Sequence, residues 1–239
     1  MTRIEAGGLT VHVAGGADGL GGGDGPAIVL CHGFGAPGDD LVALSGALPV
    51  PPGTRWFFPE APLTIDFGFG QTGRAWWPID MMALQEAMLR GRRDALSTTT
   101  PDGLHEARRA LAGCLEALGA THGIVRNSTL VGGFSQGSML ATELALSEGE
   151  PFAGLVVLSG TLLCRDRWEP MARAHAAGLH VLMTHGRRDP ILPFAWAEDL
   201  RAVLAAAGAD VTWVPHAGAH EIPRLALEGL AAFAKATLG

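Results

Sequence analysis

The sequence lacks the features that mark several large classes of protein. It has no run of basic residues, and its 17 lysines and arginines are outnumbered by 24 acidic residues, which gives a formal net charge of −7. Such an acidic chain is poorly suited to bind the phosphate backbone of a nucleic acid or anionic lipid. We therefore expect no nucleic-acid partner and a substrate that is not polyanionic.

Long apolar runs are also missing. The N-terminal stretch MTRIEAGG has no uninterrupted apolar segment of the kind found in secretory signals. No later run approaches the length that is needed to span a bilayer. These absences predict a cytoplasmic protein without integral membrane association.

Cysteine is scarce, and the glycine-rich stretch carries no phosphate-binding motif. Cys31, Cys114 and Cys164 are an odd number without C-x-x-C spacing. Two of them lie in apolar segments, where cysteine behaves as a small core residue, so we interpret all three as reduced thiols. The stretch GGADGLGGGDG (15–25) is not followed by G-x-x-x-x-G-K-[ST], which favours a flexible turn.

What is present is the composition of a packed globular protein. The 239 residues are 48% hydrophobic and 17% charged, which argues against disorder. A chain of this length buries a substantial core, either in one α/β domain or in two smaller ones. We expect one domain over residues 1–239.

Short apolar runs alternate with longer helical patterns along the chain, which is typical of parallel β-α-β units in a sheet that is buried on both faces. The run LTVHVA near residue 10 instead alternates like a half-exposed antiparallel strand. Further strands are expected at 27–31, 55–59, 129–134, 154–160, 180–185 and 211–215, and helices near 103–118, 136–147, 194–207 and 222–236.

One serine stands between glycines at the end of a predicted strand, in GGFSQGSML (132–140). Because the chain has 34 glycines, a G-x-S-x-G motif can easily occur by chance. Whether this serine is a nucleophile therefore depends on the structure predicted around it. A strand, a sharp turn at Ser135 and a helix from about Gln136 form the setting of a nucleophile elbow. Gly133 and Gly137 remove side chains where strand and helix crowd together. This context favours Ser135 as a nucleophile, with the backbone N–H of Gln136 directed at an oxyanion.

A nucleophilic serine needs a base and an orienting carboxylate, which follow it in the order Asp, His in this kind of architecture. Asp189 follows one predicted strand in GRRDPILP, and His220 follows the next strand in HAGAHEI. Catalytic groups of open α/β sheets gather at the edge where the carboxyl ends of the parallel strands lie, and both residues are predicted there. A structural Asp-Pro turn is the alternative for Asp189. His216, His185 and His32 compete as bases, but each lies closer to a strand end, where a structural role is expected.

His216 and His220 also have the four-residue spacing of a metal-binding pair on a helix. Pro215 precedes the pair and Gly218 divides it, which favours a loop. The glutamate of an H-E-x-x-H motif is missing as well. We therefore expect no metal site.

Six segments together resemble the phospholipase/carboxylesterase family of α/β-hydrolases, which includes bacterial carboxylesterases and acyl-protein thioesterases. The resemblance covers most of residues 26–238. It implies an α/β-hydrolase fold, with a mostly parallel central sheet flanked by helices on both faces. It also implies Ser135, Asp189 and His220 as the catalytic triad, and the backbone N–H of Phe34 as a second oxyanion donor. The segments are VLCHGFGAPGDDL (29–41), FPEAPL (58–63), GFSQGSML (133–140), LSGTLL (158–163), HGRRDPILP (185–193) and GAHEI (218–222).

The substrate pocket is where the chain departs from that family. Relatives usually have Arg-x-Trp followed by an aromatic and an acidic residue, whereas here Pro78 and Ile79 precede Asp80. The segment 66–100 is longer than a βα connection needs, and we expect it to form a lid or to line the pocket. We predict Trp76, Trp77, Ile191 and Leu192 as substrate-binding residues, with filling of the core edge as the alternative. The same segment carries Phe67, Phe69, Met81 and Met82, with the same two interpretations.

These residues predict a carboxylesterase-type serine hydrolase that cleaves small esters of short to medium acyl or aromatic acids through an acyl-enzyme and needs no cofactor. An acyl-protein thioesterase or lysophospholipase is the nearest alternative. An acyltransferase would keep the same triad. A non-catalytic binding protein on this fold is expected to lose a triad member, and none is lost here. We expect a monomer or a homodimer.

Overall fold

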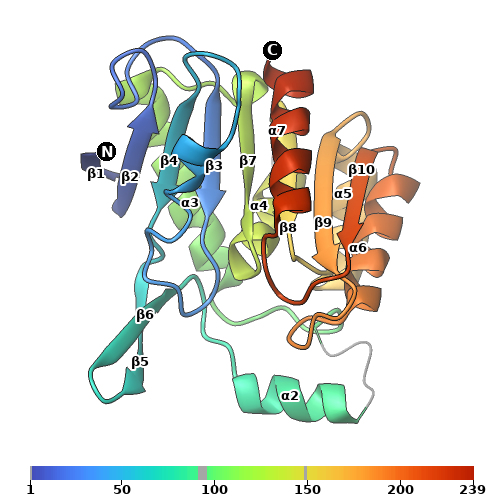
Figure 1. Cartoon of the computed structure of the whole chain (residues 1–239). Helices are drawn as coiled ribbons and strands as arrows, with labels where there is room; N and C mark the ends of the chain where they lie inside the picture. Colours follow the sequence, from blue (N-terminus) through green and yellow to red (C-terminus); the bar gives the residue numbers. More distant parts are fainter. Residues whose placement is uncertain (1, 91–95, 148–149) are drawn as a thin grey trace.

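The computed structural model describes residues 2–90, 96–147 and 150–239. Its centre is an eight-stranded sheet (Figure 1). The strands are β1 (Thr2–Ala6), β2 (Leu9–Gly15), β3 (Ala27–Cys31), β4 (Arg55–Pro59), β7 (Thr129–Phe134), β8 (Gly154–Leu158), β9 (His180–Gly186) and β10 (Asp210–His216).

The strands lie in the order β1-β2-β4-β3-β7-β8-β9-β10. The pairs β1–β2 and β2–β4 are antiparallel, whereas every later pair is parallel. All seven predicted strands are therefore confirmed, three of them (27–31, 55–59 and 129–134) with the same bounds. The sheet is mostly parallel, as expected, so the loops that follow its parallel strands meet at one edge.

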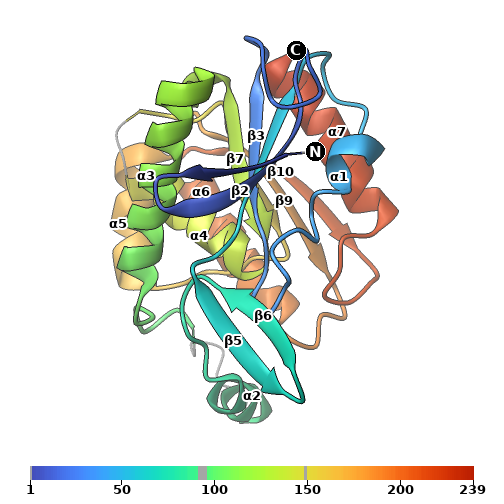
Figure 2. The ribbon, with the colours of Figure 1, turned by 90° about the vertical axis from the view of Figure 1, so that its left-hand side faces the viewer.

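Helices cover both faces of the sheet (Figure 2). The four predicted helices are confirmed as α3, α4, α6 and α7, with ends that shift by a few residues. Helix α5 was not predicted, because its sequence RDRWEPMARAH is strongly polar and contains Pro170. The helices on the two faces are α1 (Leu44–Ala47), α3 (Leu104–His122), α4 (Gln136–Ser147), α5 (Arg165–His175), α6 (Phe194–Ala206) and α7 (Arg224–Leu238).

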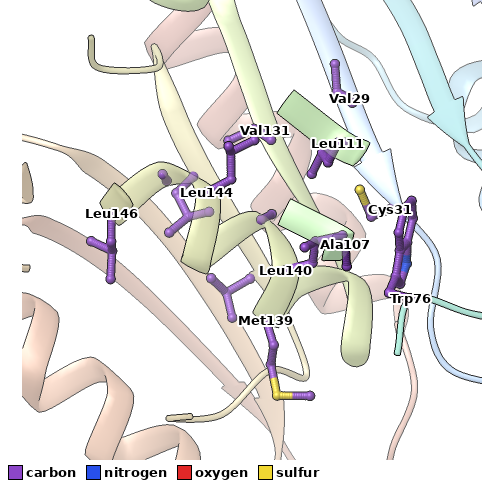
Figure 3. Close-up of a cluster of buried hydrophobic side chains, with 14 of the residues drawn as sticks. Val29, Cys31, Trp76, Ala107, Leu111, Val131, Met139, Leu140, Leu144 and Leu146 are labelled. Carbon is purple, nitrogen blue, oxygen red and sulfur yellow. The ribbon is translucent and has the colours of Figure 1, made fainter. Parts of the chain in front are cut away.

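Two apolar clusters fill the spaces between sheet and helices. The larger cluster lies under α3, α4, α5 and α6, and the smaller one lies under α7 on the other face. Figure 3 shows part of the larger cluster, where Val131 of β7, Leu144 of α4 and Leu111 of α3 lie among the labelled side chains. Burial on both faces explains why β3, β4, β7 and β8 contain so few polar residues.

We expected the strand near residue 10 to be half exposed, and this prediction was wrong. Most residues of β2 are buried, including Val11 and Val13 with no exposed surface. Strands β1 and β4 pair with its two edges, and α3 packs against it. The polar residue His12 is tolerated in this buried strand because it has a partner, the carboxylate of Glu60. The Glu60 Oε1 lies 2.8 Å from the His12 Nε2.

A hairpin and a short helix lie beyond the carboxyl ends of the parallel strands (Figures 1 and 2). The hairpin consists of β5 (Leu63–Gly68) and β6 (Gln71–Ala75), and the helix is α2 (Met81–Leu89). The N-terminus of α2 is capped by Asp80, whose side chain accepts a hydrogen bond of 2.9 Å from the Ala83 N–H. Part of the expected lid segment 66–100, namely 91–95, lies outside the described residues. No helix within the described ranges is long and apolar enough to cross a membrane.

Candidate active site

Ser135 occupies a tight turn between β7 and α4. Its φ is +52°, a left-handed conformation that a non-glycine residue rarely adopts. The backbone N–H of Ser135 donates a hydrogen bond of 2.8 Å to the Leu158 carbonyl and holds the turn against the next strand. A Cβ on Gly133 or on Gly137 would lie within 2.3 Å of the Cys31 carbonyl oxygen. Glycine is therefore required at both positions, because only glycine lets the chain on either side of Ser135 pass so close to Cys31. This close approach places the Ser135 hydroxyl at the edge of the sheet.

The structure brings Ser135, His220 and Asp189 into one chain of hydrogen bonds. The Nε2 atom of His220 lies 2.9 Å from the Ser135 Oγ, and its Nδ1 atom lies 2.6 Å from Oδ2 of Asp189. An ionised carboxylate only accepts, so Nδ1 carries the hydrogen and Nε2 is left to accept the serine proton. The ring of Phe134 packs against the imidazole, with centroids 4.8 Å apart. The arrangement has the geometry of a nucleophile, a base and an orienting acid.

Two adjoining loops position the acid and the base. They follow β9 and β10, which pair in parallel up to His216 opposite Gly186. Beyond the strands, the Arg187 N–H donates to the His216 carbonyl at 2.8 Å, and the Arg188 N–H donates to the Gly218 carbonyl at 3.1 Å. The loops are thus joined residue by residue, which fixes Asp189 relative to the base that follows β10.

Asp189 accepts three hydrogen bonds and lies close to a second histidine. Its Oδ1 accepts from the backbone N–H groups of Ile191 and Leu192 at 2.9 and 2.8 Å, so Asp189 also forms the Asp-Pro turn that was the alternative to a catalytic role. Its Oδ2 faces His220 and also the Nε2 of His185 at 3.3 Å. Burial raises the pKa of Asp189, but its interactions with His185, His220 and the backbone N–H groups outweigh burial and hold this pKa well below its ordinary value. The carboxylate is therefore ionised at neutral pH.

The depressed pKa of Asp189 couples stability to pH. Its stabilisation is fully present above the ordinary value of about 3.9 and is lost as the pH falls through the lower folded value. We expect the parent to be more stable than Asp189→Asn at about pH 7, and the difference to shrink by up to about 1.4 kcal/mol per pH unit below about pH 3.9. Urea unfolding of both proteins at neutral pH and near pH 3 measures this. A difference independent of pH would contradict the ionised carboxylate.

The competing histidines have other hydrogen-bond partners. His216 ends β10, and its Nδ1 accepts a hydrogen bond of 3.2 Å from the Gly218 N–H. Burial lowers the pKa of His216. The Nε2 of His185 lies 2.8 Å from the Leu192 carbonyl. His216 lies in a strand and His220 in a loop, so these two residues do not have the helical geometry of a zinc-binding motif.

Two backbone N–H groups at the elbow remain available as donors. No described residue accepts a hydrogen bond from the N–H of Gln136, at the start of α4, or from that of Phe34. The loop that carries Phe34 is held by β6, because the Gly35 N–H donates to the Arg74 carbonyl and the Arg74 N–H donates to the Ala36 carbonyl, both at 2.8 Å. The predicted oxyanion donors are thus unpaired among described residues, as an oxyanion hole requires before substrate binds.

A pocket of about 420 Å³ opens at Ser135 and His220. Its remaining wall is mostly apolar and comes largely from α2 and the segments that flank it. Of the predicted substrate-binding residues, Trp77, Ile191 and Leu192 lie in this wall, as does Met81. The pocket is lined by Gly33, Phe34, Trp77, Pro78, Ile79, Asp80, Met81, Ala83, Leu84, Ala87, Leu96, Thr99, Pro101, Phe134, Ser135, Met139, Leu163, Ile191, Leu192 and His220.

Trp76 does not line the pocket, which corrects its predicted place. Its side chain is 2% exposed, and its indole N–H points at the His32 carbonyl instead. Trp77 is equally buried but does lie in the pocket wall. Phe67, Phe69 and Met82 are also outside the wall, with more than half of each side chain exposed.

Comparisons with known proteins agree with this architecture. A family model described as phospholipase/carboxylesterase matches residues 23–238. An acyl-protein thioesterase 1 of Cryptococcus neoformans is 24% identical over 173 residues, which are 72% of this chain and 69% of that protein. The crystal structure of esterase PE8 superposes with a TM-score of 0.77 at 25% identity, over 96% of this chain and 99% of that one. The Bacillus cereus carboxylesterase has the same fold, with a TM-score of 0.71 at 18% identity over 95% and 93% of the two chains.

Proposed function

The chain belongs to the phospholipase/carboxylesterase family and has an α/β-hydrolase fold, and on that premise we propose that it cleaves carboxylic esters by covalent serine catalysis. One observation carries the proposal. The hydrogen-bond chain from Asp189 through His220 to Ser135 ends at the mouth of an apolar pocket. An esterase or thioesterase activity is common to the family, and the serine mechanism and the ester preference are the specific parts of the proposal.

In the first half of the reaction, the Ser135 Oγ attacks the carbonyl carbon of the bound ester while His220 Nε2 takes the hydroxyl proton. The carbonyl π electrons move to the oxygen, which accepts hydrogen bonds from the N–H groups of Phe34 and Gln136. The imidazolium formed on His220 is stabilised by the ionised Asp189. The oxyanion then re-forms the carbonyl, and the alcohol leaves with the proton from His220. The product is an acyl group on Ser135.

Water completes the cycle in the second half. His220 takes a proton from a water molecule as that water attacks the acyl carbon, and it then returns a proton to the Ser135 Oγ. The carboxylic acid leaves, and the free serine is restored. All proton transfers are made by residues of this chain and by water, so the reaction needs no cofactor.

The pocket favours uncharged acyl groups of short to medium length, or aromatic ones. The polar side chains in its wall are those of Asp80, Thr99, Ser135 and His220, while residues such as Trp77, Leu84 and Leu163 make up the apolar remainder. A wall of this kind stabilises a substrate through burial of apolar surface and penalises a buried charge. The printed names of the acyl-protein thioesterase relatives support thioesters of longer acyl chains as the second candidate.

A graded series of nitrophenyl esters and acyl thioesters, from acetyl to palmitoyl, tests the proposal. We expect the highest kcat/KM for short to medium acyl esters. We expect Trp77→Ala to shift that preference toward longer chains, because it enlarges the pocket and each methylene in an apolar pocket is worth about 1–3 kcal/mol. Trp213→Ala is the matched control, since Trp213 lies in β10 and outside the pocket wall.

The same series gives results that would contradict the proposal. A parent protein that cleaves thioesters and leaves all oxygen esters intact would favour the thioesterase alternative. If Trp77→Ala lowered kcat/KM equally at every chain length, with the protein still folded, Trp77 would be a structural support and not a part of the acyl pocket.

A further inference from the structure

The indole of Trp76 lies beside the loop that carries Phe34. Its Nε1–H donates a hydrogen bond of 3.0 Å to the His32 carbonyl, two residues before Phe34. The two rings also pack together, with the centroids of Trp76 and His32 5.5 Å apart and their planes tilted by 33°. Trp76 is one of the labelled residues of the buried cluster in Figure 3 and is nearly inaccessible. Its side chain therefore holds this loop from the interior.

The backbone of Trp76 is bonded to the other half of the proposed oxyanion hole. Its N–H donates to the Gln136 Oε1 at 2.9 Å, and the Gln136 Nε2 donates to the Trp77 carbonyl at 2.8 Å. The Gln136 side chain has no exposed surface, so water does not compete for these two bonds. Gln136 thus clamps the Trp76–Trp77 segment onto the start of α4.

His32 is fixed from a second direction. Its Nε2 accepts a hydrogen bond of 2.9 Å from the Ala61 N–H, so its Nδ1 carries the hydrogen and donates to the Gly33 carbonyl at 2.8 Å. Burial lowers the pKa of His32, which favours this neutral form. The ring and the carbonyl of His32 are therefore both held, the first by Ala61 and the second by Trp76.

We infer that Trp76 is a positioning residue that sets the distance between the two oxyanion donors, the N–H groups of Phe34 and Gln136. It hydrogen-bonds to Gln136 through its backbone and to the Phe34 loop through its indole. Donors act on an oxyanion only when they lie about 2.7–3.1 Å from it, and a misplacement of about 1 Å costs up to about a hundredfold in rate. This inference rests on the proposed serine mechanism.

The test is the change Trp76→Phe, which keeps a six-membered aromatic ring and removes the N–H donor together with the fused five-membered ring. We expect kcat to fall about 10- to 100-fold while KM changes less than about threefold, because the loss affects the transition state more than substrate binding. Trp168→Phe is the matched control. It removes an indole N–H from an equally buried tryptophan, whose partner is Glu143 at 2.7 Å, and Trp168 is not in the pocket wall. Its kcat is expected to stay within about threefold of the parent value.

A second variant covers the case in which Trp76→Phe does not fold. Incorporation of 3-benzothienylalanine at position 76 keeps the bicyclic shape and replaces the N–H by sulfur, and we expect the same selective loss of kcat. If either folded variant keeps the parent kcat, or if kcat and KM change equally in Trp76→Phe and Trp168→Phe, the inference is overturned and the proposed mechanism stands. If the parent shows no turnover that depends on Ser135, the proposed mechanism fails and the inference fails with it.

Discussion

Ser135→Ala is expected to lower ester turnover by at least about three decades and to leave the fold intact. In the proposed mechanism the hydroxyl oxygen forms the acyl-enzyme, so its removal eliminates the covalent route and leaves only binding and the oxyanion donors. The fold should survive because the side chain stands at a turn, and its one hydrogen bond to a described residue is with His220. The left-handed conformation of residue 135 is imposed by the neighbouring strand and helix and not by the hydroxyl.

Initial rates with a nitrophenyl ester, together with urea unfolding, measure both parts of this prediction. Ser147→Ala is a suitable control, because it removes a hydroxyl from the far end of α4, where the Ser147 Oγ donates to the Leu144 carbonyl at 3.1 Å. That variant should keep turnover within about twofold. A folded Ser135→Ala protein that retained a tenth or more of the parent rate would exclude Ser135 as the nucleophile.

The second large effect separates two histidines that are four residues apart. His220→Ala should be nearly inactive, with a loss of about three decades, because its Nε2 faces Ser135 and is the base in the proposed mechanism. His216→Ala should stay within about tenfold of the parent. The ring of His216 bonds the Gly218 N–H and supports the loop, but no described contact joins it to Ser135.

The pair of variants is informative because each is the control for the other. One loses an imidazole at the end of β10 and the other loses one from the loop that follows, and circular dichroism with thermal unfolding establishes whether each remains folded. Added imidazole should restore part of the activity of His220→Ala by acting as an external base. An equally large loss of activity in both variants, with both still folded, would instead indicate a network or a metal that the two histidines share.

Most of the sheet could be predicted because its signals are local. Buried parallel strands such as AIVLC (27–31) and RWFFP (55–59) are short apolar runs, and their limits are set by flanking glycine, proline and polar residues. The contacts among Ser135, Asp189 and His220 follow from the same pattern, because each residue follows a strand of one parallel sheet. Sequence order and strand direction alone bring such residues to one edge.

The parts that could not be predicted depend on contacts between distant segments. The hairpin β5–β6 is held by bonds to the loop at 35–36, which no pattern within 63–75 reveals. Trp76 and Trp77 look equivalent in sequence, and both are buried in the larger apolar cluster, but only Trp77 also lines the pocket. His185 was expected to be structural, and its second contact, with Asp189 at 3.3 Å, needed the folded loop to be seen.

Covalent labelling with an alkyl phosphonate ester tests the central claim most directly, since such a reagent captures an activated serine as a stable tetrahedral adduct. The parent and the Ser135→Ala protein would be treated in parallel, and intact-mass measurement and peptide mapping would follow. The account predicts a single adduct on the parent, located at Ser135, and none on Ser135→Ala. Equal labelling of both proteins, or an adduct on another residue of the parent, would contradict the assignment of Ser135 as the nucleophile.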